Sequence, residues 1–256
     1  MGCEPMRLFD FLQALLEDKK GDTVFTCFGF WHILYLILIL GAITAAVLFL
    51  QKQDDMTRKK WIRGSANLAF GLYILDLFLM PFAYGQIDLE KLPFHACTAM
   101  CVMCFISSRS SFWGRLRHSF ALLGLVSNLV YVIYPAGVGW YQIHPLCYRV
   151  VQTLLFHGIM SCHGILVLFF DDAPTGKKEF AQDLLVLAGM VIWALLGNTL
   201  YNGVYTKDFN WFFVQQDPFY LLPKAIAPYI MPFVTFAAFA VVMGGVRLIH
   251  KNIKKV

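Results

Sequence analysis

Residues 24–51 read VFTCFGFWHILYLILILGAITAAVLFLQ, and this stretch contains no Asp, Glu, Lys or Arg. An α-helix needs about 20 apolar residues, and at least about 17, to cross the hydrocarbon core of a bilayer. The stretch exceeds that length, so a helix built from it can cross at a tilt. It therefore predicts a transmembrane helix.

The rest of the chain repeats this pattern. Of its 256 residues, 59% are hydrophobic and 14% charged, and the mean hydropathy is +0.62. A soluble domain averages about 45–50% apolar and about 25% charged residues. The composition therefore excludes a water-soluble enzyme, a disordered protein and a nucleic-acid-binding protein. Further apolar runs of span length occupy residues 66–85, 92–108, 119–137, 146–170, 183–204 and 227–250.

These runs predict an all-α fold, a polytopic bundle of about seven transmembrane helices. We assign residues 24–256 to a single seven-helix domain and residues 1–23 to an N-terminal amphipathic segment. Within that segment, leucines recur at helical spacing over residues 6–18. This spacing predicts an interfacial helix that lies on the membrane surface.

The basic residues predict an orientation. An odd number of spans places the two ends of the chain on opposite sides. The loops of one side carry 14 of the 21 Lys and Arg residues, and those of the other side carry 7. Because basic loops stay in the cytoplasm, we expect a multi-pass cell-membrane protein with its N-terminus outside and its C-terminus cytoplasmic. The long aromatic loop 205–226 then lies outside, as a headgroup-level belt or as a re-entrant or interfacial lid.

Polar side chains inside the spans are the candidate functional residues, because a polar group in hydrocarbon is costly unless it finds a partner. Such residues occur on six different spans, and they share one depth band in the outer half of the bundle. This predicts a polar cavity that opens toward the outer leaflet. The alternative is that the Asn and His residues serve as hydrogen-bond partners between helices. The candidate substrate-binding residues are His32, Asp76, Asn128, Asn198 and Asn202.

Cys97 differs from the neighbouring cysteines because it follows Pro93 near the start of its helix. A helix N-terminus favours a thiolate. His95 lies two residues earlier, and His157 lies at a matching depth on another span. A thiol with an imidazole in reach is the minimum for nucleophilic acyl transfer. Amide donors such as Asn128 or Asn198 can support the oxyanion.

His163 is a second candidate base. It lies six residues after His157, so the two side chains project roughly 120° apart on one helix. The catalytic candidates are therefore Cys97, His157, His95 and His163. Cys101 and Cys104 share a helix face with Cys97, but no paired ligand spacing occurs elsewhere. We expect no metal site and no cofactor.

Several motifs resemble a known family. Residues 28–32 (FGFWH) resemble the start of the first span in YwaF-type bacterial membrane proteins. Residues 92–97 (LPFHAC) resemble the entry to their third span. Residues 198–202 (NTLYN) and 210–213 (NWFF) resemble their sixth span and the loop after it. The resemblance covers nearly the whole chain.

That family is distantly similar to eukaryotic transmembrane lipid acyltransferases and fatty-ester hydrolases. Those enzymes use an intramembrane nucleophile with a His on another span. The resemblance implies that Cys97 is the nucleophile, that His157 or His163 is the base, and that membrane lipids are substrate as well as solvent. The first functional hypothesis is therefore an intramembrane lipid acyltransferase or ester hydrolase.

The alternative hypothesis is a small transporter or a ligand-binding seven-helix membrane protein. Asp76 near mid-bilayer, together with several histidines, suits proton coupling. Inverted repeats and broken helices would favour transport, and neither is evident in the sequence. A third class is a membrane protein with a purely structural role.

Overall fold

The computed structural model describes residues 10, 12–13, 16–83, 88–202, 204, 209–218 and 220–253. This part of the chain forms helices and no strands. The predicted all-α polytopic bundle is confirmed. Most of the amphipathic helix expected over residues 6–18 lies outside the described residues. The helices are α2 (Phe30–Gln51), α3 (Asp55–Ala83), α4 (Ala96–Ser107), α5 (Arg117–Ile133), α6 (Ala136–Gly139), α7 (Tyr148–Phe170), α8 (Lys177–Asn202) and α9 (Ala227–Ile253), with 3-10 turns η1 (Leu89–Lys91), η2 (Trp113–Leu116) and η3 (Trp211–Phe213).

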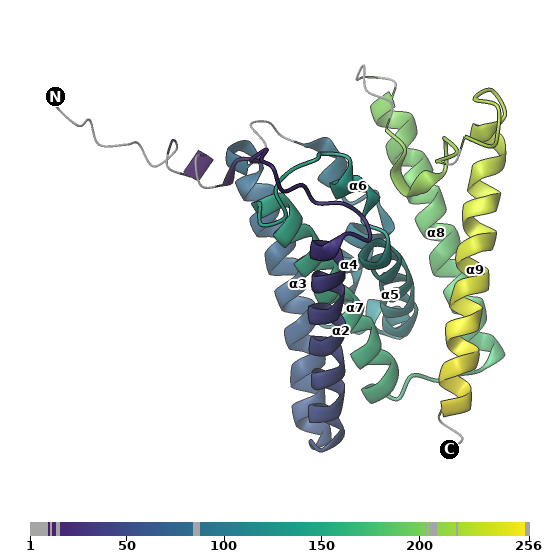
Figure 1. The fold of residues 1–256 in the computed structure, drawn as a ribbon. Helices are drawn as coiled ribbons and strands as arrows, with labels where there is room; N and C mark the ends of the chain where they lie inside the picture. Colours follow the sequence, from purple (N-terminus) through teal and green to yellow (C-terminus); the bar gives the residue numbers. More distant parts are fainter. Residues whose placement is uncertain are drawn as a thin grey trace.

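The long helices run between two ends of the bundle (Figure 1). We call the end where α2 begins the aromatic end, and the end where α9 finishes the basic end. Within the described residues, six helices are long and apolar enough to cross a membrane, counting η2, α5 and α6 as one segment. The chain is therefore a multi-pass membrane protein, and α4 is a further, shorter apolar helix.

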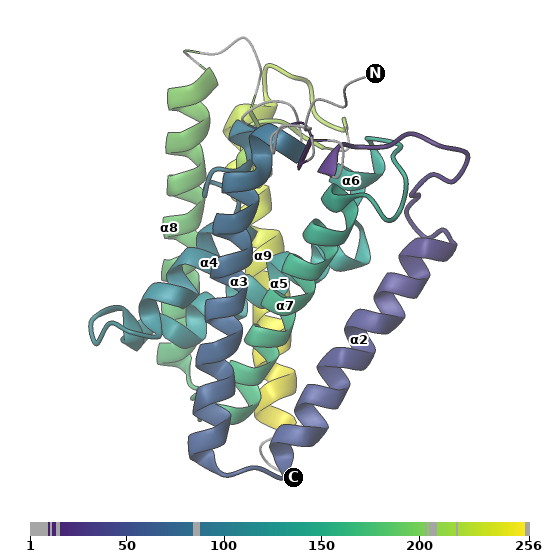
Figure 2. The ribbon, with the colours of Figure 1, turned by 90° about the vertical axis from the view of Figure 1, so that its left-hand side faces the viewer.

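Helices α5 and α7 form the centre of the bundle, whereas α2 and α9 expose most of their apolar residues. The two central helices approach closely at Gly164. A Cβ atom there would lie 2.5 Å from Cβ of Leu125 and 2.8 Å from the carbonyl oxygen of Ala121. Only a glycine fits at this crossing. The view from the side shows α2 on the outside of the bundle (Figure 2).

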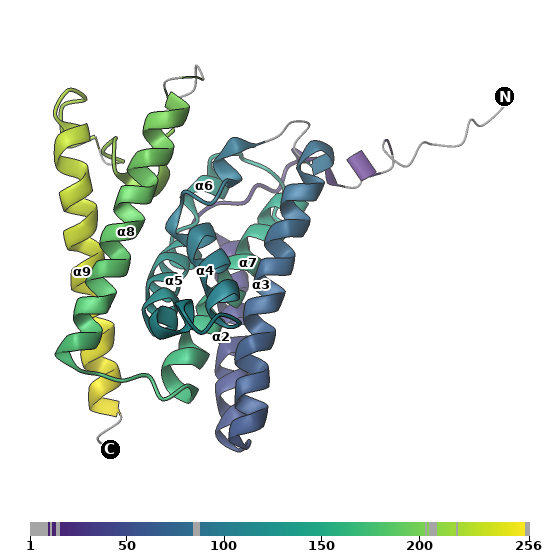
Figure 3. The ribbon, with the colours of Figure 1, turned by 180° about the vertical axis from the view of Figure 1, so that it is seen from behind.

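Helices α8 and α9 pack as a pair beside the other helices (Figure 3). A buried ion pair joins them near the basic end. The guanidinium of Arg247 donates to both carboxylate oxygens of Asp183, at 2.7 and 2.8 Å. Arg247 also donates to the carbonyl of Pro174 at 2.7 Å. This bidentate geometry fixes the half of α9 nearer the basic end against α8.

The third predicted span is shorter in the structure than the sequence indicates. We expected a helix over residues 92–108, but α4 begins at Ala96 and has 12 residues. Its length is therefore about 18 Å, compared with about 30 Å for the hydrocarbon core. Pro93 explains the late start, because proline lacks an N–H donor and disfavours helix in the residue before it. His95 is the extended N-cap residue of α4.

The irregular segment 88–95 lies against α3 and leads into α4. The hydroxyl of Tyr73 donates to the carbonyl of Lys91 at 2.9 Å, and the Lys91 ammonium pairs with Asp76 at 3.1 Å. Irregular backbone at membrane depth is stable only where protein groups surround it. The segment is stable in this position because neighbouring groups satisfy its polar atoms.

Candidate functional site

The site begins at the N-terminus of α4. Cys97 is the second residue of the helix and is half-buried. Its sulfur lies beside the backbone amides of Cys97 and Thr98. These first-turn amides have no carbonyl partner within the helix, so they are available to stabilise a negative charge on the sulfur.

Gly124 of α5 marks the point where α4, α5 and α7 meet. A Cβ atom there would lie 3.3 Å from Met100 of α4 and 3.3 Å from Met160 of α7. From these contacts we infer a neighbouring layer of side chains one turn toward the aromatic end, because positions three or four apart share a helix face. We call this group the Cys97 layer, and its members are Cys97 of α4, Asn128 of α5 and His157 of α7.

Tyr131 supports this assignment, because it lies three residues beyond Asn128 on α5. Its ring stacks on the ring of His157, with centroids 4.0 Å apart and an interplanar angle of 13°. Tyr131 also interacts electrostatically with Cys97. The Lys91 ammonium acts on both Cys97 and His157. The thiol and the imidazole therefore share two neighbours.

The imidazole of His157 has a defined tautomer. Its Nδ1 lies 2.7 Å from the carbonyl oxygen of Thr153, one turn earlier on α7. Because a carbonyl only accepts hydrogen bonds, Nδ1 carries the proton and Nε2 of the neutral ring carries a lone pair. Nε2 is buried and has no hydrogen-bond partner among the described residues. This is the arrangement that a general base requires.

Asn128 is completely buried. Its amide nitrogen donates to the carbonyl of Gly124 at 2.7 Å, and within the described chain its Oδ1 atom has no partner. Its donor group is therefore engaged on its own helix. Asn198 is engaged in the same way, since its amide nitrogen donates to the carbonyl of Trp211 at 3.1 Å. Each amide nitrogen carries two N–H groups, so the oxyanion role expected of Asn128 and Asn198 stays a prediction.

The other two candidate histidines have different surroundings. His163 is buried between α7 and α3, where its Nδ1 lies 3.0 Å from the hydroxyl of Ser65. It lies six residues beyond His157 on α7, toward the basic end. His95 accepts a hydrogen bond from the backbone N–H of Phe212 at its Nδ1, at 3.2 Å. His95 also interacts electrostatically with His157, so it lies beside the layer.

The remaining polar residues have separate partners. His32 accepts at Nδ1 from the N–H of Phe28 at 2.8 Å and contacts the carbonyl of Val132 through Nε2 at 3.0 Å. These bonds fix the start of α2 against the end of α5. Asn202 binds the backbone of Phe209 through both its amide nitrogen and its oxygen, at 3.0 and 2.6 Å. The structure thus places these residues in distinct pairs.

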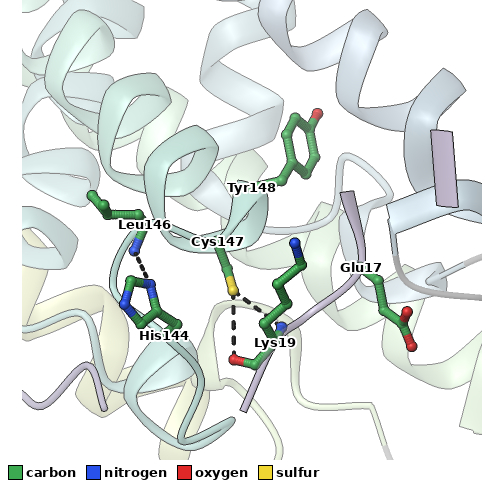
Figure 4. Close-up of a pocket in the computed structure, with 6 residues that line it drawn as sticks. All are labelled: Glu17, Lys19, His144, Leu146, Cys147 and Tyr148. Carbon is green, nitrogen blue, oxygen red and sulfur yellow. Dashed lines mark hydrogen bonds between the residues drawn. The ribbon is translucent and has the colours of Figure 1, made fainter. Parts of the chain in front are cut away.

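Asp76 belongs to a second polar group. Besides Lys91, it accepts a hydrogen bond from the hydroxyl of Tyr148 at 3.2 Å. Tyr148 also lines a pocket of about 280 Å³ at the aromatic end (Figure 4). In that view Tyr148 points away from His144, and Cys147 lies beside Lys19. The pocket is lined by Glu17, Lys19, His144, Leu146, Cys147 and Tyr148.

The loop 209–216 covers the start of α4. Asn198 holds it through the N–H and the carbonyl of Trp211, and the indole of Trp211 packs on Phe94 with centroids 4.8 Å apart. Phe212 and Phe213 have φ values of 57° and 54°. Bulky residues rarely adopt this left-handed conformation, and such strain gathers at functional sites. The lid interpretation of this segment remains a prediction.

The sequence model of the TMEM164 family matches residues 27–246. The chain belongs to the TMEM164 family. The match spans every candidate site residue, from His32 to Asn202. Neither the curated proteins nor the solved structures include a significant match to this chain.

Sequence reasoning missed two members of the site in this TMEM164-family chain. Tyr131 could have been found from its spacing, because it lies three residues after Asn128 and shares its helix face. Lys91 could have been found as a basic residue in the loop just before the third apolar run. Among the described residues, no group of three His, Cys, Asp or Glu side chains could hold a metal ion.

Proposed function

We propose that this TMEM164-family chain is an intramembrane lipid acyltransferase or ester hydrolase, with Cys97 as nucleophile and His157 as general base. One observation carries the proposal: Nε2 of His157 is buried without a hydrogen-bond partner among the described residues. Helix periodicity supports a position for this atom in the same layer as the half-buried thiol of Cys97. Catalytic hydrogen bonds are often long before substrate binds. The resemblance to YwaF-type proteins and lipid acyltransferases supports the same assignment.

The reaction proceeds in two halves. Nε2 of His157 accepts the proton of the Cys97 thiol, and the thiolate attacks the carbonyl carbon of a lipid ester. The carbon–oxygen bond then breaks, the alcohol leaves with the proton from His157, and the acyl group remains as a thioester. In the second half an alcohol or a water molecule gives its proton to His157 and attacks the thioester. Cys97 then recovers its proton.

The start of α4 supplies the electrostatic support for this chemistry. Burial of the Cys97 sulfur disfavours the thiolate, and the first-turn amides beside it offset part of that cost. His95 accepts at Nδ1, so its neutral ring carries a proton on Nε2. We assign this N–H as a donor for the oxyanion. Buried donors of this kind lower the barrier most when they are oriented before substrate arrives.

The transport alternative depends on Asp76 as a proton carrier. In the structure its carboxylate is paired with Lys91 and bonded to Tyr148. These two partners give Asp76 a structural role between α3, η1 and α7 that needs no proton transfer. This favours acyl transfer. We retain the orientation given by the basic loops, with the Cys97 layer nearer the outer leaflet.

The test is lipid analysis of cells that express the wild type, Cys97→Ala or Cys104→Ala. Cys104 is the matched control, because it lies on the same face of α4 and is fully buried. We expect the wild type and Cys104→Ala to change the acyl composition of membrane lipids equally and Cys97→Ala to have no effect. A Cys97→Ala variant that matches the wild type would refute the proposal.

A further inference from the structure

The imidazole of His157 has different surroundings at its ring nitrogens and at its ring face. In the plane of the ring, Nδ1 holds its proton against the carbonyl of Thr153 at 2.7 Å, and Nε2 has no hydrogen-bond partner among the described residues. Against the face lies the ring of Tyr131 from α5, with centroids 4.0 Å apart and an interplanar angle of 13°. Tyr131 therefore contacts the imidazole without occupying either nitrogen.

This parallel contact matters most when the imidazole is charged. His157 is buried, and a buried cation is unfavourable unless its neighbours compensate for the lost water. The face of an aromatic ring carries partial negative charge. It attracts a cation within about 6 Å of the ring centroid, most strongly where water is excluded. When His157 takes the proton of the Cys97 thiol, the imidazolium forms directly against this face.

We infer that Tyr131 is a positioning residue of the proposed reaction: its ring face stabilises the imidazolium of His157 and holds the plane of that ring. The inference rests on the proposed roles of Cys97 and His157. Because the N–H groups of an imidazolium lie in the ring plane, a stack on the face leaves Nε2–H free to point toward the sulfur. Stabilisation of the charge and orientation of the proton thus come from different sides of the ring.

Other titratable groups surround the Cys97 layer, and Tyr131 compensates for one of them. By element, these groups are His32 and Tyr35 of α2, Tyr73 and Asp76 of α3, Lys91 of η1, His95 and Cys97 at the start of α4, and Tyr131 of α5. Lys91 and His95 act electrostatically on His157. The positive charge of Lys91 disfavours an imidazolium. The face of Tyr131 offsets that effect without adding a charge of its own.

The test is the pH dependence of Cys97 alkylation. The protein in detergent micelles is treated with an alkyl-chain iodoacetamide between about pH 5 and 10, a range in which His and Cys titrate. Mass spectrometry quantifies the peptide that contains Cys97. Because the reagent reacts with the thiolate, the rate at neutral pH follows the population of the thiolate–imidazolium pair. At the alkaline end His157 is neutral in every variant, so the ring face no longer contributes.

The variants change the electronics of the ring separately from its size. Tyr131→Phe keeps the face and should stay close to the wild-type rate. Phenylalanines with one, two and three ring fluorines at position 131 keep the ring shape but weaken the negative charge of its face, so the neutral-pH rate should fall stepwise. Tyr131→Leu removes the face and should slow labelling at neutral pH by about tenfold, with a rate near that of the wild type at the alkaline end.

Tyr35→Leu is the matched control for lost packing. Tyr35 and Tyr131 pack on the same cluster of buried residues, but in the described chain the rings that contact His157 are those of Tyr131 and Phe156. Tyr35→Leu should therefore keep the wild-type pH profile. The fluorinated series keeps the size of the ring, so it decides the question even where leucine prevents folding.

Three results separate the possible failures. If His157→Ala labels Cys97 at the wild-type rate over the whole pH range, the proposed Cys97–His157 pair is wrong, and the role of Tyr131 is wrong with it. If His157→Ala slows labelling but the fluorinated series keeps a single rate at neutral pH, the pair stands and the role of Tyr131 is wrong. If Tyr131→Leu slows labelling equally at neutral and alkaline pH, Tyr131 acts through packing alone and the inference is overturned.

Discussion

Gly197 of α8 lies directly against the ring of Phe94, which is three residues before Cys97. An ideal Cβ atom on Gly197 lies 2.3 Å from Cδ1 of Phe94, whereas ordinary contacts begin at 3.4 Å. Gly197→Ala therefore forces the ring to retreat by at least about 1 Å, a shift on the scale that misplaces catalytic groups. Trp193 stacks on the same ring at 5.0 Å and Trp211 at 4.8 Å. Because Trp193 and Trp211 pack against the Phe94 ring, we expect its displacement to move the backbone that leads into Cys97.

The expected magnitudes follow from this geometry. Overpacking costs about 1–3 kcal/mol of unfolding free energy, and the helix propensity of alanine offsets up to about 1 kcal/mol. A displacement of about 1 Å at a reacting group lowers the rate by about 100-fold. Gly197→Ala should therefore lose up to about 2 kcal/mol and slow the alkylation of Cys97 far more than that loss predicts.

The assay combines thermal unfolding in micelles with the labelling rate of Cys97. Gly189→Ala is the matched control, because it lies on the same helix with open space around its Cβ position. It should be as stable as the wild type or slightly more so, with unchanged labelling. Adding Phe94→Leu to Gly197→Ala should recover both properties. Wild-type labelling by Gly197→Ala would refute the reasoning.

Three further predictions follow from other parts of the molecule. Asp183→Asn should lower stability by about 3–5 kcal/mol by leaving Arg247 buried without its partner, and the double replacement Asp183→Leu with Arg247→Met should recover most of the loss in a thermal unfolding series. A lipophilic maleimide should label Cys97 well before Cys104, which is buried; equal labelling, read by peptide mass spectrometry, would contradict the assignment. A reporter at the C-terminus should be cytoplasmic and a tag at the N-terminus accessible from outside, and the reverse accessibility would contradict the orientation.

The apolar runs predicted the helices well because the length of an apolar run decides whether a helix can cross the membrane. A membrane helix needs apolar length, and the runs at residues 24–51, 146–170 and 227–250 have it. The same measure failed over residues 92–95, which are apolar but irregular in the structure. Hydropathy does not distinguish a helix from irregular backbone that other protein segments surround. Pro93 was the local signal for the late start of α4.

The sequence selected the candidate residues but did not indicate their hydrogen-bond partners. A position near a helix start selected Cys97, and depth selected His157, because a polar group in hydrocarbon is costly without a partner. The same criteria also selected His163, whose partner on α3 is a tertiary contact that no spacing encodes. Asn198 and Asn202 share a face, as their spacing requires, yet they hold the backbone of a loop that follows them.

The short length of α4 has a consequence for how the protein is made. Segment 88–95 is completed by groups that leave the ribosome later: the indole of Trp193 donates to the carbonyl of Pro93 at 2.6 Å, and that of Trp211 to the carbonyl of Glu90 at 3.4 Å. Alone in lipid, those carbonyls would lack donors. Segment 88–95 and α4 therefore reach their final packing only after α8 and the loop beyond it have been synthesised. Cys97 acquires its surroundings late, so truncated chains released before Trp211 should insert in the membrane without a functional thiol.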